Sequence, residues 1–204
     1  MWYKLKRIMM RPNGVEKQVR HTSRLPSEYQ EVERIESDWS QIINTGYITN
    51  SNIKMEIEFM LASSAQDQVL FWTTLGNWSW TDCLAFLSGN WHFEVWASSS
   101  VWWNFSANVK HTLDYTLSSV SLDGDAKNYS ASVPWTNTLT IFYWNGKWGH
   151  TRIYTYKIYT WTTLEREFVP CYRKQDSEIW LYDRVNAVFY TNSWSWTFTK
   201  WGDV

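Results

Sequence analysis

The sequence predicts an all-β protein built from antiparallel sheets. Short segments that alternate apolar and polar residues, or that are rich in β-branched and aromatic residues, recur along most of the chain. Ser, Asn, Asp or Gly residues separate these segments, as expected of turns. No segment sustains the 3.6-residue period of an amphipathic helix. Many short strands without helices favour two antiparallel sheets stacked face to face, and 204 residues suffice for one such domain.

The first expected element is a short N-terminal β-hairpin. Residues 4–10 and 15–20 form its strands, and they flank a turn that contains Asn13 and Gly14. Asn-Gly is the strongest short signal for a two-residue hairpin turn. Pro12 stands before it and keeps the entering residue extended.

Beyond a connector at residues 21–26, at most one turn of helix is expected within residues 27–35. The clearest strand follows at residues 55–60, where every second residue is apolar and Glu56 and Glu58 occupy the solvated face. The same criteria predict strands at residues 68–72, 84–87, 92–96, 111–117, 119–122, 139–143, 152–159, 166–170, 179–182, 187–190 and 196–199.

Charge gives little support for nucleic-acid binding. The net charge is −1, so no global field draws the molecule to a polyanion. Residues 1–24 nevertheless carry seven Lys or Arg residues against Glu16 alone. Two interpretations stay open: a basic arm that touches phosphate or an acidic partner, and a solvated hairpin of alternating charge, which is the favoured one.

The chain shows no membrane or export signal. Apolar runs are shorter than a bilayer span requires, and the basic start lacks the apolar region of a signal peptide. Cys83 and Cys171 are the only cysteines, and neither has a metal-ligand neighbour. We expect buried free thiols in preference to a disulfide, because a chain of this size builds a core without one.

Tryptophan occupies places where turn geometry calls for glycine. The chain has 17 Trp and 8 Gly in 204 residues, although Gly ordinarily makes up about 7% of a protein. Trp residues stand in turn-like sequences such as Asn77-Trp78-Ser79-Trp80. Because indole is poorly suited to positive φ, we hypothesise an alternative genetic code in which many of these codons insert Gly. The opposing interpretation is a chain truly rich in Trp for stacking on sugars or bases.

Seven blocks of sequence resemble one known family. They run from Leu25 to Glu33, Ile35 to Ser37, Gln41 to Tyr47, Lys54 to Phe59, Phe168 to Lys174, Glu178 to Asp183 and Phe189 to Asn192. Together these blocks resemble the concanavalin A-like lectin/glucanase domains, laminin-G-like jelly rolls of bacterial surface proteins and phage tail or appendage proteins.

The resemblance implies a two-sheet antiparallel jelly-roll sandwich over residues 25–204. Residues 1–24 lie before it and are expected to be a basic attachment segment that offers a route to oligomers. Family members usually carry Gly at several positions that hold Trp here, which agrees with the codon hypothesis. These positions are Trp39, Trp72, Trp180, Trp194, Trp196 and Trp201.

The expected ligand site combines an aromatic ring with polar side chains. A sugar presents an apolar face and a polar rim, which a ring and Asn or Asp meet together. The candidates are Trp103, Asn104, Asp82 and Asp123. Trp102 is interpreted as a Gly position, which leaves Trp103 as a true indole. For any single aromatic residue, packing in the core is the more frequent role.

The sequence predicts no metal site, cofactor or catalytic centre. Asp123, Gly124 and Asp125 supply too few oxygens for calcium, and Asp-Gly is far more often a hairpin turn. The related hydrolases carry Glu-x-Asp-x-x-Glu, a string that is absent here. Glutamates at alternate positions, 31 with 33 and 56 with 58, are expected on outward strand faces.

We therefore expect a non-catalytic module that binds a glycan or mediates adhesion at a cell or virion surface. Its partner would be a surface glycan or a protein, with no nucleic acid and no membrane insertion. The alternative is a structural or assembly module of a phage tail or surface appendage that binds protein and not sugar. A weaker third interpretation is a glycan-cleaving enzyme with an unfamiliar carboxylate arrangement. Fold analogy carries much of this expectation, and fold alone does not fix function.

Overall fold

Strands account for all regular secondary structure in the part of the chain that the structure describes. The computed structural model describes residues 24–38, 40–62, 68–73, 84–87, 92–96, 99–131, 138–144, 147–193 and 197–204. Every strand pair in these ranges is antiparallel. The all-β prediction is therefore confirmed. None of these residues forms a helix of the length and apolarity that crossing a bilayer requires.

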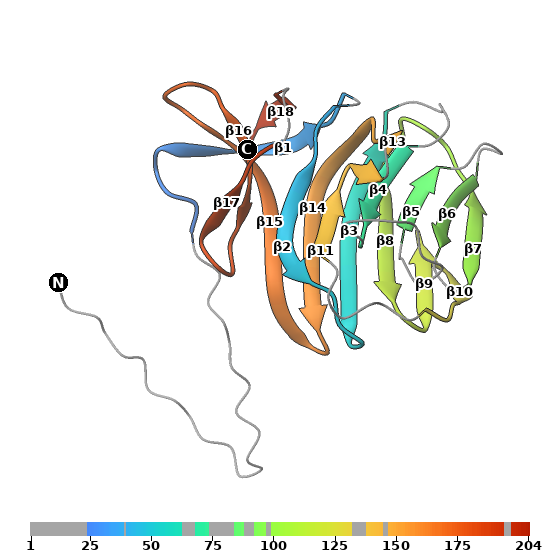
Figure 1. Ribbon diagram of the computed structural model, residues 1–204. Helices are drawn as coiled ribbons and strands as arrows, with labels where there is room; N and C mark the ends of the chain where they lie inside the picture. The colour runs from blue at the N-terminus through green and yellow to red at the C-terminus, as the bar shows by residue number, and fades with distance from the viewer. Residues whose placement is uncertain are drawn as a thin grey trace, which may run out of the picture.

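The larger sheet has ten strands, most of which curve across the molecule side by side (Figure 1). Its path is β10-β9-β8-β3-β14-β1-β15-β16-β17, and β18 pairs with β1. The strands are β1 (Tyr29–Glu36), β3 (Ile53–Leu61), β8 (His111–Thr116), β9 (Ser119–Leu122), β10 (Asp125–Asn128), β14 (Thr151–Thr160), β15 (Thr163–Arg173), β16 (Ile179–Asp183), β17 (Val188–Tyr190) and β18 (Thr199–Asp203).

A second sheet has six strands in the order β2-β11-β4-β5-β6-β7, and a two-stranded sheet joins β12 to β13. Their bounds are β2 (Ile43–Ile48), β4 (Gln68–Trp72), β5 (Leu84–Leu87), β6 (His92–Trp96), β7 (Ser100–Asn104), β11 (Thr138–Ile141), β12 (Tyr143–Trp144) and β13 (Lys147–Trp148).

Aromatic side chains from the two large sheets meet in one core. Along β3 buried residues alternate with partly exposed ones, which places one face of the strand inside. Phe59 of β3 lies 5.1 Å from Phe93 of β6, measured between ring centroids. Phe71 of β4 meets Tyr115 of β8 edge-on at 5.9 Å. This shared core is compatible with a β-sandwich.

Most predicted strands are present, and four of them, at 68–72, 84–87, 92–96 and 119–122, have the expected bounds. At most one turn of helix was expected within residues 27–35, and none forms there, since β1 runs through most of that segment. The strand expected at 196–199 is also misplaced, because β18 begins at Thr199. Strands β1, β2, β7, β10 and β13 were not among the strands predicted from local pattern. The predicted N-terminal hairpin lies outside the described residues.

The structure supports two expectations about individual residues. Cys171 is a buried free thiol, and burial raises its pKa to about 12, while Cys83 lies outside the described residues. Glu56 and Glu58 alternate with buried residues on β3, so both project to the outer face as expected.

Among the described residues, one tryptophan adopts the backbone conformation that favours glycine. Trp161 lies between β14 and β15 with φ of 56° and with 71% of its surface exposed. Trp72, Trp180 and Trp201, three of the positions assigned to Gly by resemblance, lie instead within strands. Trp39, Trp194 and Trp196 lie outside the described residues.

Replacing Trp161 with Gly is expected to stabilise the protein by about 1 kcal/mol, because a side chain with Cβ resists the left-handed region. Urea denaturation measures the change. Trp102→Gly is the matched control, since Trp102 is 49% exposed but lies in extended β7, where Gly is expected to destabilise. A loss of stability in Trp161→Gly would contradict the prediction.

Candidate functional site

Trp103 lies in the core. Its side chain is 5% exposed, and its Nε1 donates a hydrogen bond to the backbone oxygen of Asp125 at 3.0 Å. Its ring lies 6.5 Å from that of Phe93. The indole would have to leave this position to stack on a sugar.

Asn104 and Trp102 share the opposite, exposed face of β7. Trp102 stacks on His92 of the neighbouring strand, with ring centroids 4.2 Å apart. Lys127 donates a hydrogen bond to the backbone oxygen of Trp102 and lies 5.3 Å from its ring. The accessible indole on the same face as Asn104 is therefore Trp102, which was interpreted as a Gly position.

Asp123 stabilises a hairpin turn. It precedes Gly124 between β9 and β10, and both residues have positive φ. One carboxylate oxygen accepts a hydrogen bond from the Thr112 amide at 2.8 Å, and the other lies 2.6 Å from His111 Nδ1. The predicted Asp-Gly turn is confirmed. Asp82, the remaining predicted residue, lies outside the described residues. In the described ranges no three His, Cys, Asp or Glu residues are grouped as metal ligands.

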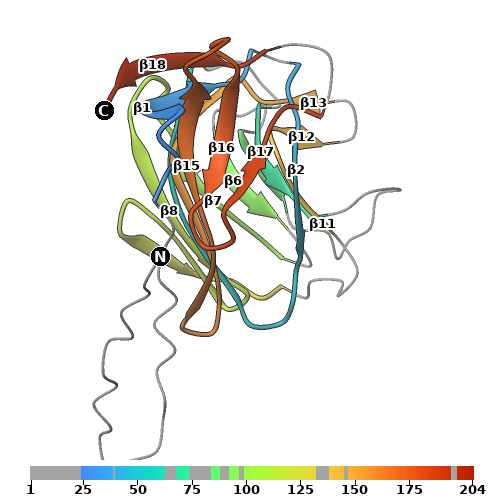
Figure 2. The same ribbon diagram turned by 90° about the vertical axis from the view of Figure 1, so that its left-hand side faces the viewer.

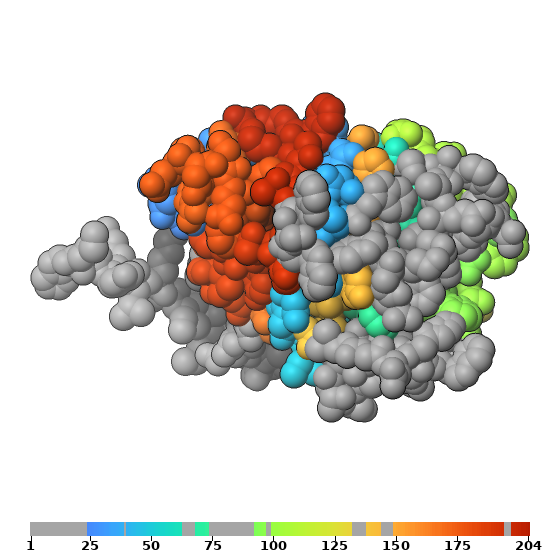
Figure 3. Space-filling view, turned by 45° about the horizontal axis from the view of Figure 1, so that its top comes forward, coloured from blue at the N-terminus to red at the C-terminus, as the bar shows by residue number. Residues whose placement is uncertain are grey.

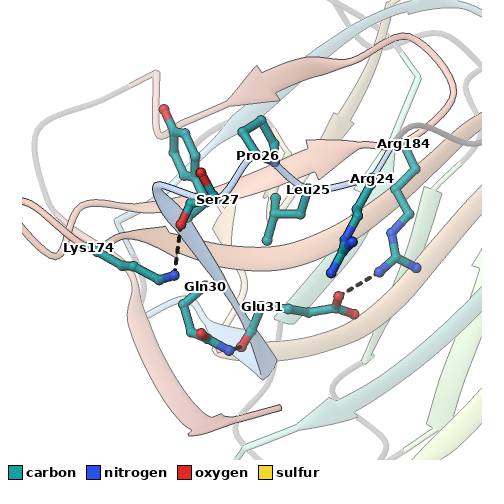
Figure 4. Close-up of a pocket in the computed structure, with 9 residues that line it drawn as sticks. Arg24, Leu25, Pro26, Ser27, Gln30, Glu31, Lys174 and Arg184 are labelled. Atoms are coloured by element: carbon teal, nitrogen blue, oxygen red, sulfur yellow. Dashed lines mark hydrogen bonds and ion pairs between the residues drawn. The ribbon is translucent and has the colours of Figure 1, made fainter.

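A pocket of about 820 Å³ lies at the start of the described chain, where β1 begins. We call it the β1 pocket. In the space-filling view the C-terminal strands, coloured orange and red, adjoin the blue residues that begin β1 (Figure 3). The pocket is lined by Arg24, Leu25, Pro26, Ser27, Tyr29, Gln30, Glu31, Lys174 and Arg184 (Figure 4).

Strand pairing brings the pocket's distant segments together. Tyr29 of β1 is the register partner of Arg173 in β15, so Lys174 follows at the edge of the pocket. The backbone amide of Lys174 donates to the Glu28 carbonyl at 2.9 Å, and its ammonium donates to the Ser27 carbonyl at 2.8 Å. Figure 2 shows β1, β15 and β16 gathered at this end of the molecule.

Aromatic packing and a turn hold Tyr29, one of the lining residues, in place. The Tyr29 ring stacks on Phe189 of β17, with centroids 4.0 Å apart and planes 22° apart. The Tyr29 amide donates to the Pro26 carbonyl at 3.0 Å, which closes the turn before β1. Gln30 donates to the backbone oxygen of Val204 at 2.8 Å. These contacts fix the side chain of Tyr29 and anchor that of Gln30, so these two residues lose little conformational entropy on binding.

Cations outnumber carboxylates in the lining. Arg24, Lys174 and Arg184 are positive, and Glu31 is the one acidic residue among the described lining residues. Arg184 forms an ion pair with Glu31 at 2.5 Å. The Lys174 ammonium donates its hydrogen bond to a neutral carbonyl, so this contact does not neutralise its charge.

A smaller groove of about 280 Å³ adjoins the β1 pocket and shares Glu31 and Arg184 with it. Its remaining charges are largely paired across the outer face of the ten-stranded sheet. Lys110 lies 2.7 Å from Glu58. Lys157 lies 3.8 Å from Glu167. Four carboxylates and three cations line this groove, so its net charge is opposite to that of the β1 pocket.

The glutamates with clear pKa shifts are poor general acids. Burial raises the pKa of Glu56, but hydrogen bonds from Lys54 and Tyr159 outweigh this and leave it below the ordinary 4.5. The pKa of Glu36 is lowered in the same way, by hydrogen bonds from Arg152 and His150 that outweigh burial. A glycosidase acid needs a raised pKa, so neither carboxyl suits that role.

Sequence reasoning did not identify the β1 pocket as a site. Its lining comes from residues 24–31 together with two cations about 150 positions later, and only strand pairing unites them. The available signal was the resemblance itself, because two of its blocks, Leu25 to Glu33 and Phe168 to Lys174, lie side by side here.

Comparison with known proteins leaves the family open. No family model matches the chain, and no characterised protein matches it in sequence.

Proposed function

We propose that the protein is a non-catalytic module that binds a glycan, and that the β1 pocket holds the ligand. The observation that carries the proposal is the lining, in which seven of nine residues have polar side chains. Pockets for drug-like molecules are mostly apolar, whereas hydroxyl-rich ligands need many hydrogen-bonding partners. A volume of about 820 Å³ lies within the range of small-ligand sites.

The site does not depend on the codon hypothesis, since none of its lining residues is Trp. The proposal also includes a jelly-roll topology for residues 25–204, supported by two large antiparallel sheets with a shared core. It places the protein at a cell or virion surface in an adhesive role, with a surface glycan or a protein as partner and no cofactor.

Filling the pocket tests the proposal. Ser27 is exposed and lines the pocket, so Ser27→Tyr is expected to weaken glycan binding roughly ten-fold or more by occupying ligand volume. Binding is measured on a glycan array and then by titration calorimetry. Ser118→Tyr, which places the same side chain on an exposed turn that does not line the pocket, is the control and should bind like the unaltered protein.

The array also separates the two functional classes. Binding to no glycan, with stable self-assembly or capture by a protein of the same particle, would favour the assembly module. Equal glycan affinity of Ser27→Tyr and the unaltered protein would show that the ligand does not bind in the β1 pocket. The exposed Trp102 face would then be the next surface to alter.

A further inference from the structure

The charge of the β1 pocket narrows the class of ligand. Arg184 is paired with Glu31, which leaves two cations, Arg24 and Lys174, without a carboxylate partner among the described residues. Within the described part of the chain, the Arg24 guanidinium has neither an ion pair nor a hydrogen bond. An anion bound here would neutralise these cations without displacing an ion pair formed among the described residues.

These two cations lie on different sides of the pocket. Figure 4 shows Lys174 on one side and Arg24 with Arg184 on the other. A ligand in the pocket therefore meets positive charge from two directions. Guanidinium groups bind carboxylate, sulfate or phosphate through paired hydrogen bonds, and such charge-assisted bonds are roughly twice as strong as neutral ones.

The preference is confined to this pocket. The adjoining groove carries four carboxylates against three cations, so it does not attract an anion. The molecule as a whole has a net charge of −1 and supplies no general field for polyanions. Selectivity for an anionic group must therefore come from Arg24 and Lys174 locally.

Resting on the function proposed above, we propose that the β1 pocket binds an acidic saccharide, one whose ring carries a carboxylate, sulfate or phosphate group. Its volume is far larger than a single inorganic anion needs, so the anionic group is one part of a larger ligand. Ser27, Tyr29 and Gln30 line the rest and offer partners for hydroxyl groups.

The experiment compares the unaltered full chain with Lys174→Gln, Arg24→Gln and the control Lys54→Gln. Lys54→Gln removes the same charge from a residue that does not line the pocket. The probes are matched oligosaccharides that are neutral, carboxylated, sulfated or phosphorylated, together with polyglutamate as a non-sugar polyanion. The pocket variants are expected to weaken binding of the acidic saccharides roughly ten-fold each, and the control by less than about two-fold.

Two further results are expected. Affinity for the acidic saccharide should fall as salt rises, since exposed charges are screened within about 10 Å at 0.1 M ionic strength. Arg24→Gln should leave the melting temperature unchanged, because the described residues supply no partner for its side chain to lose. The carboxylated, sulfated and phosphorylated probes show which anionic group the pocket prefers.

Each contrary outcome has its own meaning. Binding of neutral oligosaccharides alone would overturn the acidic-ligand inference and leave the proposed glycan function standing. Binding of polyglutamate as tight as that of the saccharides would overturn saccharide selectivity. Binding of no saccharide at all would overturn both the acidic-ligand inference and the proposed glycan function. Equal losses of affinity in the pocket variants and in Lys54→Gln would show that the acidic group does not bind in the β1 pocket.

Discussion

Replacing Gly149 with Ala is expected to destabilise the protein by about 3 kcal/mol, near the upper end of what overpacking costs. A Cβ at this position would clash with the backbone oxygen of Val69 and would lie 2.9 Å from Thr151 Oγ1. The nearer atom is backbone in β4, so relief requires a shift of the strand. The Gly149 amide also donates to the Phe142 carbonyl at 2.8 Å, which holds the glycine in place.

Gly46→Ala is the comparison variant. Gly46 has φ of 63°, but beyond its two chain neighbours no heavy atom lies within 4 Å of the place that a Cβ would take. Ala there therefore meets only the cost of left-handed backbone, about 1–2 kcal/mol. Chemical denaturation at equilibrium gives both values. A loss at Gly149 no greater than that at Gly46 would show that β4 and the residues before β14 are not packed as closely as described.

Replacing Glu36 with Leu is expected to destabilise the fold by about 3 kcal/mol, because removing one member of a mostly buried ion pair leaves the charge of the other uncompensated. Glu36 is 8% exposed. Its carboxylate accepts from Arg152 Nε at 2.7 Å and from Trp201 Nε1 at 3.0 Å, and His150 Nε2 lies 2.8 Å away. The substitution leaves Arg152, whose side chain is 18% exposed, without its carboxylate.

The same carboxylate makes stability depend on pH. Burial raises the pKa of Glu36, but its hydrogen bonds from Arg152 and His150 lower it more, so the folded pKa lies below the ordinary 4.5. A lowered folded pKa means that ionised Glu36 stabilises the protein above about pH 4.5 and that this contribution is lost as pH falls through the folded pKa. The free energies of unfolding of the unaltered protein and Glu36→Gln should therefore differ at pH 7 and converge as the pH falls to 3. Denaturation curves at several pH values in this range measure them.

Glu58→Gln is the control for both measurements. Glu58 pairs with Lys110 at the surface, where both side chains are more than a third exposed, and such pairs contribute at most about 1 kcal/mol. Its removal should change little at any pH. A flat difference between Glu36→Gln and the unaltered protein across the acidic range would contradict the assigned role of Glu36.

Local pattern predicted the strands with strong β-forming residues. Strand β4 contains Val69, Leu70 and Phe71, and its bounds were predicted correctly. Strand β1 contains Glu31, Glu33 and Arg34, and these charged residues interrupt the apolar pattern by which a strand is predicted. It forms because β14, β15 and β18 all pair with it, which is information that no local window contains.

The candidate site was less accessible to prediction than the fold. Trp103 and Trp102 are neighbours, and the sequence does not reveal which one faces the core, because a one-residue change of register exchanges the faces of a strand. The structure buries Trp103 and exposes Trp102. For Asp123, by contrast, the Asp-Gly turn was predictable from two adjacent residues, and the structure contains it.

By itself the sequence determined the all-β class, most of the strands and the Asp-Gly turn, because alternation and turn chemistry act over a few residues. Only the tertiary structure decided which residues share a surface. The β1 pocket exists because antiparallel pairing of β1 with β15 places Lys174 beside Ser27, 147 positions away in the chain. Such contacts depend on the register and packing of whole sheets, and these are set by the complete core.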